Sequence, residues 1–94
     1  MRVAWSPEAV QDRRHIWEYI AVDDIEAAIA MDEVFSKAAD SLSDFPLRGR
    51  PGRVEGTREL ILHEHYCLVY EVDQGAVWVL ALVHTSRQWP PVRD

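Results

Sequence analysis

The stretch that decides the fold is YCLVYEVDQGAVWVLALV, which covers residues 66–83. Apolar side chains recur with the short period of β-strands on both sides of residues 73–75. These three linking residues, Asp-Gln-Gly, end in glycine and suit a hairpin turn closed by a residue with positive φ. The second run, from Ala76 to Val83, is apolar on both faces, so we expect it at the centre of a sheet.

A third strand is predicted before this hairpin, because the residues from Arg58 to His63 alternate in the same way. Upstream of it, the segment from Phe45 to Arg53 contains two prolines and two glycines. These residues interrupt both helical turns and strand ladders. We therefore predict a loop over the whole segment.

The start of the chain predicts a short strand that runs directly into a helix. Arg2 to Trp5 alternates apolar and polar residues, and Ser6, Pro7 and Glu8 supply an N-cap, a first-turn proline and an acidic first-turn residue. Apolar residues at helical spacing extend this helix to about Ala21 and form its buried stripe: Ala9, Ile16 and Ile20.

A second helix is predicted immediately afterwards. Asp23 is the expected N-cap, because Glu26 three residues later completes a capping box. The predicted buried stripe of this helix consists of Ile25, Ala28, Ile29, Phe35, Ala38, Ala39 and Leu42. Two helices joined by so short a link are expected to pack as an antiparallel hairpin.

The element order is therefore βααβββ. It predicts an α+β fold in which the helical hairpin packs on one face of a small, mostly antiparallel sheet. A chain of 94 residues has room for one such core, so residues 1–94 are expected to form a single domain.

The composition excludes several classes of protein. Hydrophobic residues make up 48% and charged residues 28%, which allows a buried core, and the apolar residues are too dispersed to cross a membrane. The first seven residues lack the features of a signal peptide, so we expect a cytoplasmic protein. Cys67 is the single cysteine, which excludes an internal disulfide and a cysteine-based zinc cluster. No cofactor is expected.

The charge is unevenly distributed along the chain. The formal net charge of -6 argues against a general nucleic-acid binder, because non-specific affinity depends on Lys and Arg at phosphates. The whole excess of acidic residues lies in residues 1–45, whereas residues 46–94 balance to zero. Within that second half, one short stretch concentrates the positive charge: Arg48, Arg50, Arg53 and Arg58.

Several short motifs, in order along nearly the whole chain, resemble the RelE/ParE superfamily of type II toxins. They are Trp5-Ser6-Pro7, Leu47-Arg48-Gly49-Arg50, Gly56-Thr57-Arg58-Glu59-Leu60, Tyr66 with Tyr70, Val83-His84, and Arg87-Gln88-Trp89-Pro90. The resemblance implies the same βααβββ fold and a small bacterial toxin that a cognate antitoxin holds inactive. We expect the antitoxin to bind apolar grooves beside the helical hairpin and the sheet edge.

The superfamily contains two activities. ParE-like members poison DNA gyrase, and RelE-like members cut mRNA in the ribosome. The ending Arg87-Gln88-Trp89-Pro90 resembles the ParE branch, and the acidic chain with its one lysine, Lys37, is poorly suited to ribosomal RNA. We therefore favour gyrase as the target. In the nuclease alternative the catalytic roles would belong to Arg58, His84 and Arg87, although Arg58 also occurs in the gyrase-directed branch.

The expected target-binding residues are five arginines and one tryptophan. Guanidinium groups suit carboxylates and phosphates, and tryptophan often anchors protein interfaces. The set is Arg48, Arg50, Arg53, Arg58, Arg87 and Trp89. Trp89 either folds back on the sheet or is exposed to a partner, and Arg58 has the alternative of a structural pair with Glu59 or Glu64.

The histidines have more ordinary interpretations. His63 and His65 flank Glu64 and could form half of a metal site, but no third ligand is evident, so we expect exposed turn residues and no metal. His84 is expected to be a hydrogen-bonded residue at the sheet edge, with an acid–base role as the alternative. Trp78, inside the most apolar strand, is expected in the core.

Overall fold

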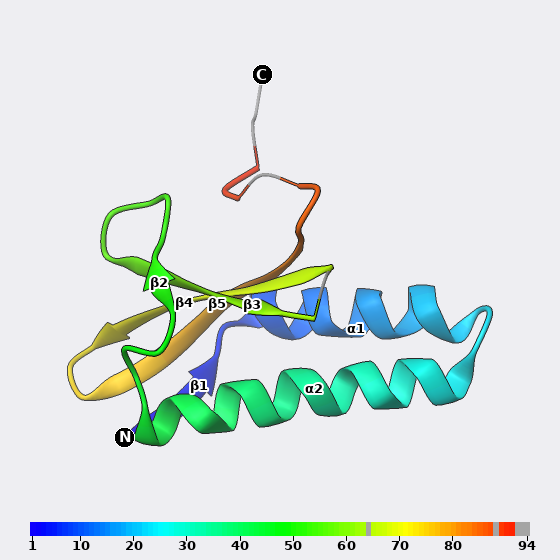
Figure 1. Ribbon diagram of the computed structural model, residues 1–94, viewed down its shortest axis with the longest axis horizontal. Coiled ribbons are helices and arrows are strands. Elements are labelled where there is room, and N and C mark those ends of the chain that lie inside the picture. Colours follow the sequence, from blue (N-terminus) through cyan, green and yellow to red (C-terminus); the bar gives the residue numbers. More distant parts are fainter. Residues whose placement is uncertain (64, 88, 92–94) are drawn as a thin grey trace.

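The computed structural model describes residues 1–63, 65–87 and 89–91, and shows two helices on one side of a five-stranded sheet (Figure 1). The elements are β1 (Arg2–Trp5), α1 (Pro7–Ala21), α2 (Ile25–Asp44), β2 (Arg50–Pro51), β3 (Thr57–Leu62), β4 (Tyr66–Asp73) and β5 (Ala76–His84). This order confirms the predicted α+β fold with its helical hairpin.

The strands follow the order β1-β5-β4-β3-β2 across the sheet. β1 is parallel to β5, and the other neighbours are antiparallel, as predicted. The β4–β5 turn contains Gln74 with φ 50° and Gly75 with φ 77°, which confirms the positive φ expected of the closing glycine. β5 is an interior strand between β1 and β4, while β4 is the middle strand of the five.

The predicted loop from Phe45 to Arg53 is wrong at two residues. Arg50 pairs with Glu59 and Pro51 with Arg58, which forms β2 at the edge of the sheet. Proline lacks an N–H group and is tolerated in strands mainly at such an edge, where the missing donor faces solvent. The prolines and glycines therefore shorten the strand without abolishing it.

The helix starts agree with the prediction for α1 and differ by one residue for α2. Ser6 accepts a hydrogen bond from the Ala9 N–H at 3.0 Å, as an N-cap does. For α2 the cap is Asp24, whose side chain accepts from the Ala27 N–H at 3.1 Å, so the prediction of Asp23 is wrong. Asp23 instead lies in the turn that follows α1, where its N–H donates to the Ile20 carbonyl at 3.1 Å.

The main core lies between the two helices and the sheet. Its most buried side chains include Phe35, Leu42, Leu68, Tyr70, Val77 and Val79. Two residues of the predicted α2 stripe are instead exposed, Ile25 to 58% and Ile29 to 49%. They lie near the α1–α2 turn, which extends beyond the strands, so no sheet reaches them (Figure 1).

The opposite face of the sheet, called the outer face below, is packed more lightly. Cys67, Val69 and Ala81 form a small buried cluster there, with Val83 and Trp89 packed against it. The prediction of a core position for Trp78 is wrong, since this side chain is 38% exposed. Val77 and Val79 fill the core, so the intervening Trp78 must point to the outer face.

Neither described helix combines the length and the apolar composition needed to cross a membrane.

Candidate functional site

Two hollows lie on opposite sides of the sheet. The first, called the outer pocket, measures about 250 Å³ and is lined by Arg50, Arg53, Arg87 and Trp89 together with apolar residues of β3, β4 and β5. The second, called the helix-side pocket, measures about 800 Å³ and lies between the two helices and the ends of β4 and β5. His84 and Arg87 line both, so the end of β5 and the residues after it form a shared wall.

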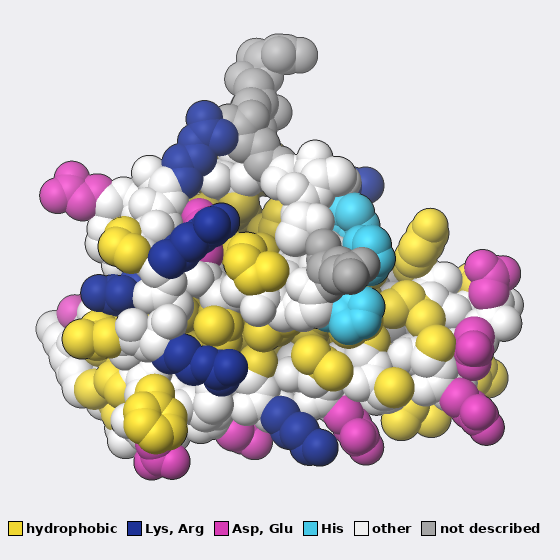
Figure 2. All heavy atoms as spheres, viewed as in Figure 1, with side chains coloured by type: hydrophobic (Ala, Val, Ile, Leu, Met, Phe, Trp, Pro, Cys, Tyr) yellow, Lys and Arg dark blue, Asp and Glu magenta, His cyan; other side chains and the backbone are white. Residues whose placement is uncertain are grey.

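The outer pocket has an internal carboxylate that orders its arginines. Glu59 on β3 accepts hydrogen bonds from the Arg50 guanidinium at 3.3 Å and from the Arg53 backbone N–H at 3.1 Å. The Arg50 side chain remains 66% exposed, whereas Glu59 is 17% exposed. The Glu59 carboxylate therefore holds Arg50 and the Arg53 backbone in place, while the Arg50 guanidinium stays accessible to a partner. Figure 2 shows side chains of the Lys and Arg class gathered over this β2–β3 side of the molecule.

Trp89 forms an apolar wall of the outer pocket. It packs against the cluster of Cys67, Val69 and Ala81, which confirms that it folds back on the sheet. Burial, together with the nearby Glu59 charge, raises the pKa of the Cys67 thiol to about 11. The thiol therefore stays protonated at neutral pH and is no nucleophile.

Arg58 lies on the other side of the sheet and holds a loop. Its guanidinium donates to the Gly49 carbonyl at 2.7 Å and to the Leu47 carbonyl at 3.5 Å. Tyr70 assists, because its hydroxyl donates to the Pro46 carbonyl at 2.8 Å and accepts from the Gly49 N–H at 2.9 Å. The predicted structural partners differ from this: Glu59 pairs with Arg50, and Glu64 lies outside the described residues.

Arg48 is also separate from the outer pocket. Its guanidinium donates to the Ser41 hydroxyl at 2.9 Å, and it borders a shallow hollow with exposed Phe45 and Leu47. Of the six predicted target-binding residues, the structure therefore brings four together, Arg50, Arg53, Arg87 and Trp89. It places Arg48 and Arg58 elsewhere.

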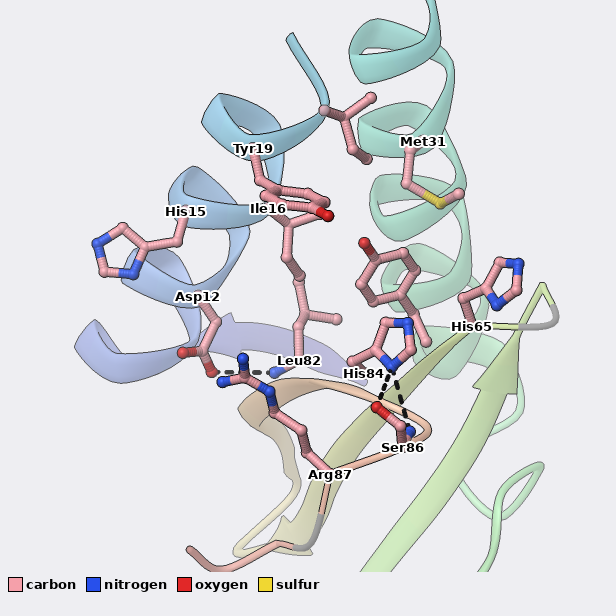
Figure 3. A pocket seen from close by; sticks show the side chains of 12 residues that line it. Asp12, His15, Ile16, Tyr19, Met31, His65, Leu82, His84, Ser86 and Arg87 are labelled. Carbon is pink, nitrogen blue, oxygen red and sulfur yellow. Dashed lines mark hydrogen bonds between the residues drawn. The ribbon is translucent and has the colours of Figure 1, made fainter. Parts of the chain in front are cut away.

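The helix-side pocket lies beside the end of β5, where β1 no longer pairs with this strand and residues of α1 and its N-cap bind the free edge instead. β1 pairs with β5 only as far as Trp5 with Val79. Beyond that point, Ser6 donates from its hydroxyl to the Leu80 carbonyl at 3.2 Å, and Asp12 accepts from the Leu82 N–H at 3.1 Å (Figure 3). Burial raises the pKa of Asp12, although the hydrogen bond from Leu82 opposes this effect.

Sequence analysis missed Asp12 as a pocket residue. The available signal is its spacing, since it lies three residues after Ala9 and four before Ile16 on the buried stripe of α1. A carboxylate on an apolar helix face needs a hydrogen-bond donor when the helix packs. The exposed backbone edge of β5 provides that donor.

The side chain of His84 is fixed by Ser86. The Ser86 N–H donates to Nδ1 of His84 at 3.2 Å, so the neutral ring carries its proton on Nε2. The ring stacks on His65 with a centroid distance of 5.8 Å and meets the edge of Tyr66 at 5.5 Å. This confirms the hydrogen-bonded position expected for His84 at the sheet edge.

His63 and His65 lie in the β3–β4 turn and are exposed, as predicted. Their ring centroids are 5.7 Å apart. Within residues 1–63, 65–87 and 89–91, no group of three or more His, Cys, Asp or Glu side chains is arranged to hold a metal ion.

The three candidate catalytic residues of the nuclease alternative, Arg58, His84 and Arg87, do not line one pocket. His84 and Arg87 line the helix-side pocket, but Arg58 does not. Along β4, Arg58 pairs with Tyr70 and His84 with Tyr66. This offset of four residues corresponds to about 13 Å along the strand at the usual rise. The backbone positions of Arg58 and His84 are therefore well separated along the sheet.

Comparison with known proteins identifies the family. The model of the ParE toxin of the type II toxin–antitoxin system parDE matches residues 3–89. The putative toxin Y4kP of Sinorhizobium fredii is 36% identical over 92 residues, which cover 97% of this chain and 95% of that protein. Toxin RelE2 of Caulobacter vibrioides is 34% identical over 86 residues, which cover 92% of this chain and 97% of that protein.

Solved structures share the fold. A chain of the chromosomal ParDE toxin–antitoxin system from P. aeruginosa superposes with a TM-score of 0.78 at 22% identity, covering 89% of this chain and 95% of that one. A conserved hypothetical protein from Helicobacter pylori superposes with a TM-score of 0.57 at 14% identity. The match covers 92% of this chain and 96% of that one. Fold, family match and relatives agree: the chain belongs to the ParE toxin family of type II toxin–antitoxin systems, within the RelE/ParE superfamily.

Proposed function

We propose that this ParE-family chain poisons DNA gyrase by binding it in the cytoplasm, and that a cognate antitoxin neutralises it. The observation that carries the proposal is the outer pocket, where Arg50, Arg53 and Arg87 meet Trp89. Arginine and tryptophan dominate the binding energy of protein interfaces, because both combine a large contact area with directed hydrogen bonds. The lightly packed outer face leaves this pocket accessible.

Binding is better supported than catalysis. Cleavage of RNA needs a general base, a general acid and a charge stabiliser around one phosphate. The guanidinium of Arg58 is already engaged by the carbonyls of Leu47 and Gly49, at a distance from His84. The net charge of -6 also opposes approach to ribosomal RNA.

The experiment that tests the target is induction of the chain in a host without the antitoxin. We expect cleaved-DNA complexes of gyrase and a DNA-damage response, with mRNA left intact. Antitoxin co-expression should suppress both signals, which serves as the control for specificity. Cleavage of mRNA at ribosomal A-site codons without cleaved-DNA complexes would instead identify the ribosome as the target.

A further inference from the structure

All four histidines of the chain gather at one end of the sheet, although they are far apart in sequence. His15 on α1, His65 before β4 and His84 at the end of β5 line the helix-side pocket, although the His15 ring is directed away from the other two (Figure 3). His63 lies beside His65. The stacked rings of His65 and His84 are nearly parallel, with an interplanar angle of 12°. The folding topology thus creates a site with several groups that can take up protons near neutral pH.

The rest of the pocket is suited to an apolar chain segment. Ile16, Ile20 and Met31 line it from the two helices. Nearby on the hairpin end, Tyr19 is 78% and Val22 is 82% exposed, so apolar surface continues outward from the pocket. A hollow of about 800 Å³ that opens onto such a surface has room for several side chains of a peptide.

The charges of the pocket indicate what this segment must carry. Arg87 is positive at every relevant pH, and its side chain reaches across the pocket toward Asp12 (Figure 3). Asp12 is the one carboxylate among the described lining residues, and it is occupied by the Leu82 N–H. Two histidines, His65 and His84, and an arginine therefore face an incoming ligand in a chain with a net negative charge. A carboxylate-bearing ligand complements them.

We propose that protonation of His65 and His84 strengthens the docking of an apolar antitoxin segment that carries at least one Asp or Glu side chain and occupies the helix-side pocket. The proposal takes from the proposed function only that an antitoxin is the partner.

The expected sign follows from linkage. A carboxylate beside an imidazolium raises the pKa of that histidine in the complex, so binding takes up protons. The gain in affinity is complete below the ordinary histidine pKa of about 6.5 and is lost as the pH rises through the higher value in the complex. In the free chain, two protons on the stacked rings would repel each other, and the incoming carboxylate relieves that repulsion.

The other groups facing the histidines do not reverse this sign. Burial raises the pKa of Tyr66, which therefore stays neutral, and Arg87 stays charged. The raised pKa of Asp12 means that acid removes its negative charge earlier than usual, which lessens repulsion of the ligand and acts in the same direction. His63, outside the pocket lining, provides a matched control.

The test is calorimetric titration of the chain with its antitoxin at about pH 8, 7 and 6, a range that spans the histidine transition. We expect the wild-type affinity to rise at least about fivefold between the highest and lowest pH, the size of one partly exposed ion pair. Whatever its affinity at the highest pH, the double variant His65→Gln/His84→Gln has no side chain at these two positions that takes up a proton near neutral pH. It should lose most of the rise, whereas His63→Gln should keep it.

An affinity that is independent of pH, or that falls in acid, would overturn the proposal. So would a double variant that keeps the full rise, or a His63→Gln variant that loses it. If circular dichroism shows that the double variant is unfolded, the single variant His65→Gln replaces it, with a partial loss of the rise expected. Normal pH-dependent docking by a chain that leaves gyrase unaffected would support this proposal and contradict only the proposed target.

Discussion

The two faces of the sheet differ in what covers them and in the kind of charge they present. The helix-covered face buries most of the core, and its pocket contains histidines, whose charge depends on pH. The outer face has a smaller buried cluster around Val69, and its pocket contains arginines, whose charge does not depend on pH. One strand supplies both faces, because successive residues of β5 point in opposite directions.

This difference teaches how a domain of 94 residues can offer two distinct surfaces. The stabilising side chains are concentrated on one face, so the other face can keep exposed apolar and cationic groups for a partner. His84 and Arg87 border both pockets, and the residues after β5 therefore connect the two surfaces. The following predictions test this division of roles.

The largest effect is expected for Phe35→Ala on the helix-covered face. Phe35 is 1% exposed and meets the edge of Tyr66 at 5.4 Å, so its removal leaves a cavity. We expect a loss of about 3–5 kcal/mol in the free energy of unfolding, measured by urea denaturation. The outer-face control Ile61→Ala, at a side chain that is 47% exposed, should cost about 1 kcal/mol or less. Equal losses at the two positions would contradict the division.

A smaller effect is expected at Asp12. Asp12→Ala removes the acceptor of the Leu82 N–H and should cost about 1–2 kcal/mol in the free energy of unfolding. Asp12→Asn keeps an acceptor oxygen without the buried charge, so it should be as stable as the wild type at neutral pH or more stable.

The stability of the wild type and that of Asp12→Asn should depend on pH in different ways. Because the pKa of Asp12 is raised in the folded state, the folded wild type binds the proton more tightly than the unfolded chain. Its contribution to stability is therefore greatest in acid and falls as the pH rises through the raised pKa. The advantage of Asp12→Asn over the wild type should grow over the same range. An advantage that shrinks as the pH rises would contradict the partly buried position of this carboxylate.

The smallest effect on stability is expected for Arg58→Ala. Loss of its hydrogen bonds to the carbonyls of Leu47 and Gly49 should lower the free energy of unfolding by about 1 kcal/mol, because Tyr70 still holds the loop. Toxicity should fall, since this loop leads directly to Arg50. Unchanged toxicity with a large drop in the thermal midpoint would make Arg58 a purely structural residue.

Local signals made most of the fold predictable from the sequence. The β4–β5 hairpin and the Ser6 cap each depend on neighbouring residues, and both are present. The cap of α2 was misplaced because Asp23 and Asp24 both suit that role, and the choice depends on where the last turn of α1 ends. Helical spacing identified the apolar face of α2, but it cannot show that the sheet stops short of Ile25 and Ile29.

The candidate sites were less predictable, because they depend on contacts between distant segments. The arginines of the loop before β3 drew attention as a sequence cluster, yet only part of that cluster faces the outer pocket with Arg87 and Trp89. The histidines gave no joint signal, since His15 and His84 are separated by almost the whole chain. Only the packing of α1 against the end of β5 brings them to one pocket.

The most direct test of the account is the affinity of the purified chain for purified DNA gyrase, measured for two matched variants. Arg87→Ala removes a cation of the outer pocket, and Arg48→Ala removes an exposed arginine that lies outside it. We predict that the wild type binds gyrase, that Arg87→Ala weakens binding by about tenfold or more, as expected for an interface hot spot, and that Arg48→Ala stays within about twofold. Far-UV circular dichroism and an unchanged thermal midpoint show that each variant is folded. A wild-type chain that does not bind gyrase, or equal losses for the two variants, would contradict the assignment of the outer pocket to the target.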